Sequence, residues 1–350
     1  MPAPVTVEVA GEPPADWAEF ARRLGGFYHD PAWLAALRET FGFRLHCVSA
    51  RRGPDLAGLL ALMEVPRFGG APRLVSLPFS YAAGPLTDDP LVTGALLERA
   101  GRLARERRAH RLEIKTRDPA GPPLNGFQRV LRYHTYRVSL AGGEDAVWGG
   151  LHADSTRRSI KKGMKEGATV EHADREDCWL DMARLNERTS HRHGTPAPPR
   201  RFFVEACRGL QRSGRTDLYL ARAPGGAVVG GIVVYKGPTD WIYAFGASDP
   251  SASTYRATHL LIWRAIGDAI AAGMHVFDLG RASPDQAGLV EFKRRWGAQA
   301  SPLAYDYWPS AGGLHAGARA HGSIALAAKL WRLLPSPLAR AGSFLYRYLG

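Results

Sequence analysis

One pattern of expected strands occurs twice in the chain, and this repeat limits the fold more than any other feature. Segments 45–62 (LHCVSARRGPDLAGLLAL) and 218–235 (LYLARAPGGAVVGGIVVY) each contain a strand, a Gly/Pro turn and an apolar strand with a glycine near its start, Gly58 or Gly230. Each is followed by a third expected strand, a helix and a short buried strand. Self-similarity over this length indicates a duplicated domain. The alternative is that any two α/β segments share so coarse a pattern of strands, turns and helices.

The first half opens with two expected helices and continues with strands. Asp30-Pro31 and Asp89-Pro90 are helix-start signals, each followed by apolar residues at helical spacing. Period and turn signals predict helices at 16–24, from 31 and from 90, and strands at 45–50, 56–65, 74–79, 112–115 and 133–140.

The second half repeats this order after a basic helix at about 146–163. The pattern predicts strands at 169–172, 217–222, 228–235, 241–245, 276–279 and 303–307, and helices at 176–188, 199–212, 258–272 and 285–295. We therefore expect an α/β (α+β) chain of two tandem domains with mixed sheets, at 1–143 and 144–309, followed by a tail at 310–350.

Net charge and cysteine content limit the expected binding partners and the cellular compartment. The formal net charge of +13 favours anionic partners such as RNA, nucleotide phosphates or anionic lipids, although basic residues can also serve solubility alone. Cys47, Cys178 and Cys207 are far apart and form no CxxC, so we expect a reducing compartment without disulfides or zinc. The N-terminus lacks a signal-peptide pattern and no long apolar run occurs, which predicts a cytoplasmic chain.

Four segments of the second half stand out: 151–171 (LHADSTRRSIKKGMKEGATVE), 193–203 (HGTPAPPRRFF), 243–248 (YAFGAS) and, most specifically, 273–299 (GMHVFDLGRASPDQAGLVEFKRRWGAQ) with LAYDYW behind it; the first half adds HDPAWLAAL and LPFSYAAGPL. Together these segments resemble the FemAB family of transferases, in particular its exopolysaccharide-associated bacterial subgroup. The resemblance covers about 27–308 and implies twin GNAT (acetyltransferase-like) domains, whose element order agrees with the pattern above. It also implies an acceptor cleft shaped mainly by the first domain, and donors that are aminoacyl-tRNA or other activated acyl groups.

Transfer of an acyl group to an amine requires an oriented donor and a stabilised oxyanion, but no nucleophile from the protein. The resemblance matches Lys293, in EFKRRWG, to a lysine that faces donor phosphate and developing charge. Asp278 and Arg281, in FDLGR, flank a glycine at the end of an expected buried strand, where ligands collect in α/β sheets. The structural alternatives are a solvated helix lysine and an internal Asp–Arg pair that holds the turn.

Other residues are candidates for substrate binding. Arg158, Lys162 and Lys165 share a helix face, with Arg157 and Lys161 beside it, and such a stripe suits phosphates or is merely solvated. Arg256 remains where acetyl-CoA enzymes carry a Gly-x-Gly cradle, but both glycines are missing. The remaining candidates are possible cleft walls, for which packing is the alternative: Tyr81, His193, Thr195, Tyr243 and Phe292. His191 and His193 lack acidic or Cys partners nearby, so we expect no metal.

The tail reads as two short basic amphipathic helices at 324–334 and 338–349. It contains Arg319, Lys329, Arg332, Arg340 and Arg347 and no acidic residue. It either rests on an anionic inner membrane surface or packs back on the domain.

Three functions fit these observations. The first is transfer of an aminoacyl group to a peptidoglycan-type cell-envelope precursor. The second is acyl-CoA-dependent N-acylation of an amino sugar or exopolysaccharide intermediate. The third is a non-catalytic basic GNAT-like protein that binds RNA or membrane. For either enzyme we expect no tightly bound cofactor, only aminoacyl-tRNA or acyl-CoA as donor.

Overall fold

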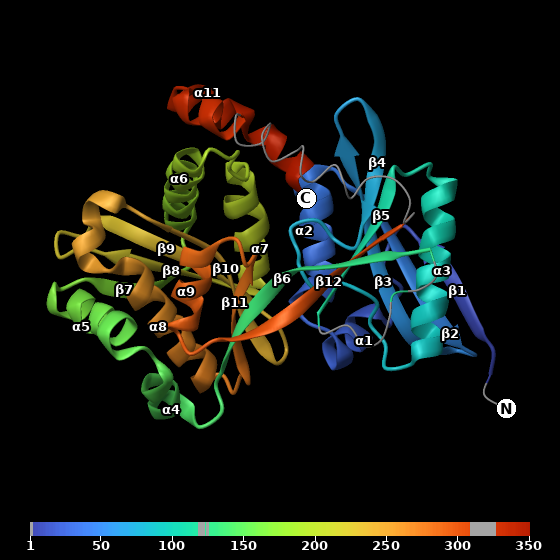
Figure 1. Ribbon diagram of the computed structural model, residues 1–350, viewed down its shortest axis with the longest axis horizontal. Coiled ribbons are helices and arrows are strands. Elements are labelled where there is room, and N and C mark those ends of the chain that lie inside the picture. The colour runs from blue at the N-terminus through green and yellow to red at the C-terminus, as the bar shows by residue number, and fades with distance from the viewer. Residues whose placement is uncertain (1–2, 118–122, 124–125, 309–326) are drawn as a thin grey trace. The chain divides into compact units, whose positions relative to one another are not determined.

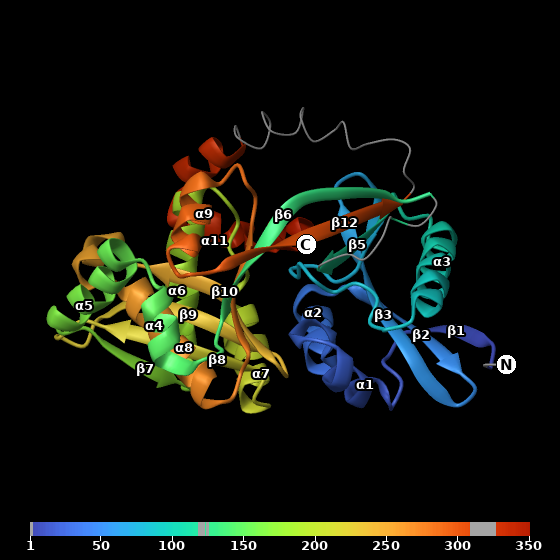
Figure 2. The ribbon, with the colours of Figure 1, turned by 60° about the horizontal axis from the view of Figure 1, so that its bottom comes forward.

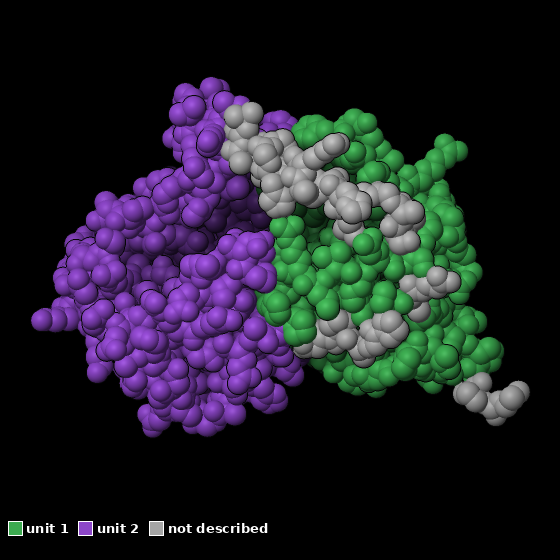
Figure 3. Space-filling view, viewed as in Figure 1, with its two compact units in different colours: residues 1–134, 302–318, 347–350 green, residues 135–301, 319–346 purple. Residues whose placement is uncertain are grey.

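A computed structural model describes residues 3–117, 123, 126–308 and 327–350, and these divide into two compact units. Unit 1 comprises 1–134, 302–318 and 347–350, and unit 2 comprises 135–301 and 319–346 (Figure 3). These units group residues that contact one another in space. The domain boundaries expected at 143/144 and 309/310 instead divide the chain into consecutive segments, and they stay a prediction.

Unit 1 is a sheet with helices on both faces. In Figure 2 its strands lie between α3 (Pro90–Glu106) and the pair α1 (Trp17–Leu24) and α2 (Pro31–Phe41). The strands run in the order β1-β2-β3-β4-β5-β12. Their bounds are β1 Val5–Ala10, β2 Arg44–Arg52, β3 Asp55–Arg67, β4 Gly70–Val75, β5 Arg111–Arg117 and β12 Gln299–Trp308.

Unit 2 has the same plan. Figure 1 shows α6 (Glu176–His193) and α7 (Arg208–Arg212) on one side of its sheet and α4 (Gly143–Gly150), α5 (Arg158–Lys165) and α8 (Ala257–Ala271) on the other. The strands run in the order β7-β8-β9-β10-β11-β6. Their bounds are β7 Thr169–Ala173, β8 Thr216–Arg222, β9 Val228–Lys236, β10 Asp240–Ser248, β11 Val276–Ala282 and β6 Gln128–Ser139, and helix α9 (Ala287–Arg294) follows β11.

Strand pairing confirms the predicted duplication. From β1 to β4 and from β7 to β10 every neighbouring pair is antiparallel. The next pair is parallel in both units, β4 with β5 and β10 with β11. Helix α3 connects the parallel strands of unit 1 and α8 those of unit 2. The chain therefore folds as two GNAT-like domains, as expected.

The final strand of each sheet comes from the other half of the chain. β12 pairs antiparallel with β5 of unit 1, from Leu303↔Arg117 to Trp308↔Leu112, while β6 lies next to β11. The strands predicted at 133–140 and 303–307 are present as parts of β6 and β12. Which strands they pair with was not predicted, because pairing over this separation leaves no local trace in the pattern.

The repeated glycines are places where a helix approaches the sheet closely. A Cβ on Gly230 would lie 2.7 Å from Cβ of Ala257 in α8, and one on Gly231 would lie 2.9 Å from Sδ of Met182 in α6. In unit 1 a Cβ on Gly58 would lie 2.5 Å from Cγ1 of Val92 in α3. Gly58 and Gly230 thus have the same role in the two units, which explains their recurrence.

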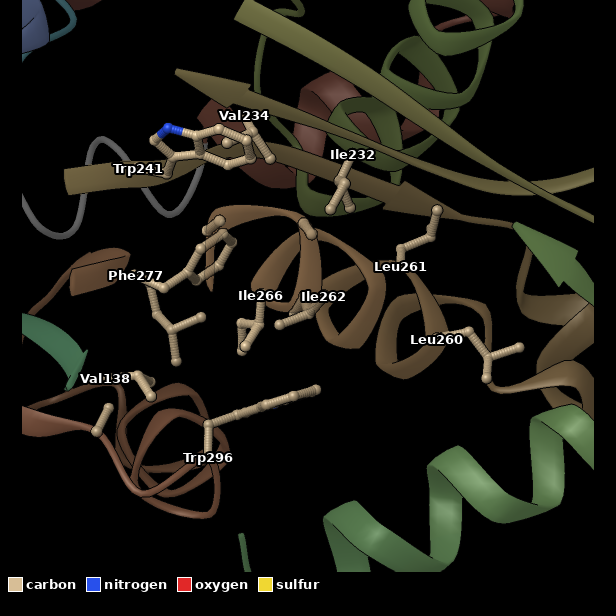
Figure 4. Close-up of a cluster of buried hydrophobic side chains, with 14 of the residues drawn as sticks. Val138, Ile232, Val234, Trp241, Leu260, Leu261, Ile262, Ile266, Phe277 and Trp296 are labelled. Atoms are coloured by element: carbon tan, nitrogen blue, oxygen red, sulfur yellow. The ribbon is translucent and has the colours of Figure 1, made fainter. Parts of the chain in front are cut away.

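Each connecting helix packs on a buried apolar cluster. In unit 2, Leu261 and Ile266 of α8 pack with Phe277 of β11 and with Trp296, which is fully buried (Figure 4). In unit 1, Leu96 of α3 packs on Leu60, Leu74 and Leu112. The predicted helix starts are also present, since Asp30 Oδ1 accepts from Ala32 N and Asp89 Oδ1 from Leu91 N, both at 2.8 Å.

Three expectations about the elements need correction. Strand β1 was not predicted, although Val5, Val7 and Val9 alternate with Thr6 and Glu8. The basic helix expected at 146–163 is interrupted at Leu151-His152, so α4 and α5 are separate and a π-helical turn at Ala153–Arg157 leads into α5. The second tail helix is shorter than expected, with α11 at Ser336–Ala341 followed by a 3-10 stretch at Gly342–Leu349. Arg319 and part of the first tail helix lie outside the described residues.

Candidate functional site

The site in unit 2 forms where the pairing of two parallel strands ends. β10 and β11 are in register from Asp240↔Val276 to Ile242↔Asp278, and both strands continue beyond this point. β10 also shifts register against β9 between Tyr243 and Phe245. Ligands in sheets of this kind bind beyond the carboxyl ends of parallel strands, so the residues that follow Ile242 and Asp278 are candidates for binding a substrate.

Asp278 is a fully buried carboxylate in the last paired position of β11. Its Oδ1 accepts hydrogen bonds from Oγ1 of Thr135 at 2.5 Å and from the backbone N of Gly280 at 2.7 Å. Thr135 comes from β6 and is itself fully buried. A buried charge is costly unless it is hydrogen-bonded or paired; these two donors serve Oδ1, and the ammonium described next acts on the carboxylate through charge.

Lys293 of α9 brings its ammonium to the end of the same strand. The side chain is only 4% exposed, and Nζ donates to the carbonyl oxygens of Gly280 at 2.7 Å and Arg281 at 2.9 Å. Nζ also lies 5.5 Å from the centroid of the Tyr136 ring. The alternative of a solvated helix lysine is therefore wrong for Lys293, although its neighbours Arg294 and Arg295 are exposed.

The environment of Lys293 lowers its pKa toward neutral pH. Burial lowers the pKa of Lys293 to about 8; the Asp278 carboxylate opposes this shift and the Arg281 guanidinium adds to it. A group with such a pKa can donate or accept a proton during a reaction. The structure thus brings the three predicted catalytic residues together: Asp278 and Lys293 are buried, whereas Arg281 is exposed.

Aromatic side chains pack near this cluster. The half-buried Tyr243 follows the last paired residue of β10, and burial raises its pKa to about 12, so it stays a neutral phenol. The ring of Phe292 lies 5.7 Å from that of His259 and 6.4 Å from that of Trp296. Both predicted residues therefore pack against the core around β11 and α9, and their contact with a substrate stays a prediction.

His259 was missed in the sequence, although its position in the first turn of a helix beside Arg256 was a usable signal. Burial, together with the charge of Arg256, lowers the pKa of His259 to about 4, so the ring is neutral near pH 7. Arg256 is exposed and holds a left-handed backbone, φ 50°, immediately before α8. The start of α8 thus combines a permanent cation with a neutral imidazole.

The basic helix packs beside this helix start. α5 contacts both α8 and the turn at Pro250–Tyr255, and α4, α5 and α8 lie together in Figure 1 and Figure 2. Arg158, Lys161, Lys162 and Lys165 are exposed, and Arg157 is half-buried. Nζ of Lys161 lies 6.0 Å from the centroid of the Trp148 ring. Unit 2 therefore presents a cationic surface along α5 next to Arg256.

The other predicted binding residues lie elsewhere. His193 is exposed at the end of α6, where its carbonyl oxygen accepts from Arg332 at 3.4 Å. Thr195 lines a cavity of about 160 Å³ between α6 and the tail. Tyr81 belongs to unit 1, where its ring packs edge-on against Tyr28 at 5.4 Å. Their roles in binding stay predictions.

The three cysteines are not suited to act as nucleophiles at neutral pH. Burial raises the pKa of Cys47 to about 12 and also raises those of Cys178 and Cys207, so these free, buried cysteines remain thiols at neutral pH.

Across the described ranges, no group of three or more His, Cys, Asp or Glu side chains is arranged to hold a metal ion. In the same ranges, no helix has the length and apolar character needed to cross a membrane.

Comparison with known proteins agrees with this fold. Residues 153–294 match the acetyltransferase (GNAT) domain family. No curated protein matches the sequence. Among solved structures, FemX has a TM-score of 0.69 at 16% identity and covers 85% of this chain and 96% of its own.

Two further structures share the two-domain plan. L-PGS from Bacillus licheniformis has a TM-score of 0.58 at 13% identity and covers 93% of this chain and 100% of its own. A tandem GNAT protein from the clavulanic acid biosynthesis pathway has a TM-score of 0.54 at 12% identity, covering 89% and 100%. At these identities the likeness concerns the fold. The FemAB-like resemblance is confirmed at the level of the GNAT domain and the two-domain fold.

Proposed function

We propose that this chain, which carries a GNAT acetyltransferase domain over residues 153–294, transfers an aminoacyl or acyl group from an activated donor to an amine of a cell-envelope precursor of the peptidoglycan stem-peptide type. The observation that carries the proposal is the buried Lys293 ammonium, held by two carbonyls next to the Asp278 carboxylate at the end of β11. The folds of FemX and L-PGS support it.

The reaction forms one C–N bond and breaks the ester or thioester bond of the donor. Attack by the amine places negative charge on the carbonyl oxygen, and the amine must then lose a proton. An ammonium at the reaction centre stabilises such an oxyanion. With a pKa of about 8, Lys293 can give its proton to the leaving oxygen or sulfur and then take up the proton that the amine loses, which restores the ammonium. Asp278 acts as a positioning residue, since its charge favours the protonated form of Lys293.

The donor is held by cations rather than by a glycine cradle. Both donor types carry phosphates, and Arg256 with the exposed cations of α5 offers a surface for them. Replacing Arg158 and Lys162 together by Gln is expected to raise the KM for the donor about tenfold, with a smaller change in kcat, because these contacts form before the transition state. The matched control is Arg175→Gln, an exposed arginine paired with Asp177 at 2.6 Å.

A second candidate is N-acylation of an amino sugar or exopolysaccharide intermediate with acyl-CoA. The match to a GNAT acetyltransferase domain favours it, whereas the turn before α8, STYRA, lacks the glycines of a pyrophosphate cradle. A lipid-linked acceptor would place either enzyme at the inner face of the cytoplasmic membrane. Neither candidate requires a tightly bound cofactor.

Separate incubations distinguish the donors. The full chain is mixed with charged tRNA or with acetyl-CoA, each with a stem-peptide acceptor or an amino sugar, and donor loss and acceptor mass are followed. The proposal expects product from charged tRNA and the stem peptide, lost in Lys293→Met. Product from acetyl-CoA and the amino sugar alone would support the second candidate. Failure of every pair, with RNA binding retained, would indicate the non-catalytic alternative.

A further inference from the structure

One side of the tail packs on α6. Nε2 of His191 hydrogen-bonds to the carbonyl oxygen of Leu334 at 2.9 Å, and Nε of Arg340 lies 3.4 Å from Oε2 of Glu187. Trp331, Ala339 and Ser343 line the cavity that the tail forms with α6. This face of residues 327–346 therefore has an occupant within the chain, and Figure 1 shows α11 beside α6.

The tail also exposes four large apolar side chains to water. Leu330, Leu333, Leu338 and Phe344 are 58%, 79%, 58% and 61% exposed. They follow one another at intervals of three to six residues and alternate with the inward residues Trp331, Ala339 and Ser343. A helix at a water-facing surface normally presents polar residues on its outer side. An outer side of leucine and phenylalanine indicates that this surface meets something other than water.

The positive charge of the tail indicates an anionic partner. Lys329 and Arg332 are exposed beside the outer leucines, Arg340 follows them, and the sequence contains no Asp or Glu after Asp306. A protein partner with a matching apolar groove would not by itself require a segment free of acidic residues. Apolar side chains flanked only by cations are the composition of segments that lie in the interface of an anionic bilayer.

We infer that residues 327–344 form a docking surface for an anionic lipid bilayer, with Leu330, Leu333, Leu338 and Phe344 inserted among the acyl chains and Lys329 and Arg332 at the phosphates. The packed face keeps the segment on α6 while the outer face binds lipid. This inference goes beyond the proposed function, because it depends on the tail alone and not on the chemistry at Lys293.

Vesicle co-sedimentation of the full chain tests the surface. Vesicles of equal parts phosphatidylglycerol and phosphatidylcholine are expected to bind the protein, whereas phosphatidylcholine vesicles bind it far more weakly. Replacing Leu330, Leu333, Leu338 and Phe344 together by Ser should weaken binding at least tenfold, to about background, because the inserted apolar area is lost. Lys329→Gln with Arg332→Gln should weaken it about fivefold per cation removed.

Matched controls distinguish binding through this surface from non-specific binding of exposed apolar residues to vesicles. Leu91 and Leu131 are 76% and 58% exposed outside the tail, so Leu91→Ser with Leu131→Ser should leave vesicle binding unchanged. Unaltered binding by the four-site tail variant would overturn the inference, as would equal binding to both vesicle types. A wild-type chain that forms dimers through the four residues, seen by light scattering, and ignores vesicles would assign the face to a second copy instead.

Discussion

The Nζ atom of Lys293 lies 2.7 Å from the carbonyl oxygen of Gly280, two residues after the buried carboxylate of Asp278. The lysine is thus held by main-chain oxygens at the end of β11 rather than by a direct contact with the carboxylate. This arrangement keeps the ammonium in a fixed place and leaves Asp278 to act on it through charge. Preorganised charge of this kind accelerates a reaction that develops an oxyanion.

Replacement of Lys293 should abolish most of the transfer while the fold persists. Lys293→Met keeps the length and apolar stem of the side chain but removes the ammonium, so we expect turnover to fall by about a hundredfold or more. Steady-state kinetics measure the loss, and circular dichroism checks the fold. Arg294→Met, at the exposed neighbouring position, should retain turnover; equal activity of wild type and Lys293→Met would remove the site assignment.

The lowered pKa of Lys293 also predicts a pH dependence of stability. The folded pKa of about 8 lies below the ordinary 10.5, so the unfolded chain binds more protons between these values. The charged lysine therefore opposes folding below about pH 8, and this penalty, about 3 kcal/mol at most, disappears as the pH rises through 10.5.

Urea unfolding of wild type and Lys293→Met at about pH 7 and about pH 9.5 measures this effect. The variant should gain stability relative to wild type at the lower pH, and this advantage should shrink at the higher pH. A difference between the two proteins that does not change with pH would mean that Lys293 titrates normally.

The duplicated sheet could be predicted because its signals are local. Turn residues, apolar alternation and the recurrent Gly58 and Gly230 all lie within short segments, and the structure confirms the pairs β2–β3 and β8–β9. The exchange of β6 and β12 could not be predicted. The partner of each strand is fixed by contacts far along the chain, as in the pairing of β12 with β5.

The sequence predicted which residues form the candidate site, but not that Lys293 is buried there. Asp278 and Lys293 were named from the FDLGR and EFKRRWG segments, yet Lys293 stands next to two exposed arginines, so the sequence alone gave no sign that it is buried. Its burial comes from the turn of α9 onto β11. Thr135 was not predicted at all, because its contact with Asp278 depends on the strand exchange.

His172 should contribute to stability in a way that declines with rising pH. Its Nε2 lies 2.9 Å from Oδ1 of Asp217, and this hydrogen bond is the main cause that raises the pKa of His172 above 6.5; burial and Lys236 oppose it, and Asp268 supports it. A raised folded pKa contributes stability that is complete below the unfolded value and is lost as the pH rises through the folded one.

Thermal unfolding of wild type and His172→Gln at about pH 6 and about pH 8 tests this contribution. Wild type should unfold at the higher temperature at the lower pH, and the gap should narrow at the higher pH. An NMR titration of the His172 ring should give a midpoint above 6.5. A gap that widens with pH would contradict the assigned pairing.

Gly230 should tolerate no side chain, because α8 approaches β9 too closely at this point. The Cβ of Gly230→Ala would lie 2.7 Å from Cβ of Ala257, so either the helix or the strand must shift. Overpacking of this size costs about 1–3 kcal/mol, measurable as a lower urea midpoint. Ala257→Gly in the same chain removes the opposing methyl and should restore most of the loss. Gly225→Ala, in a turn with open space around it, is the matched control and should be nearly neutral. If Gly230→Ala were as stable as wild type, the close approach of helix and sheet, which Gly58 shares in unit 1, would not be what maintains these glycines.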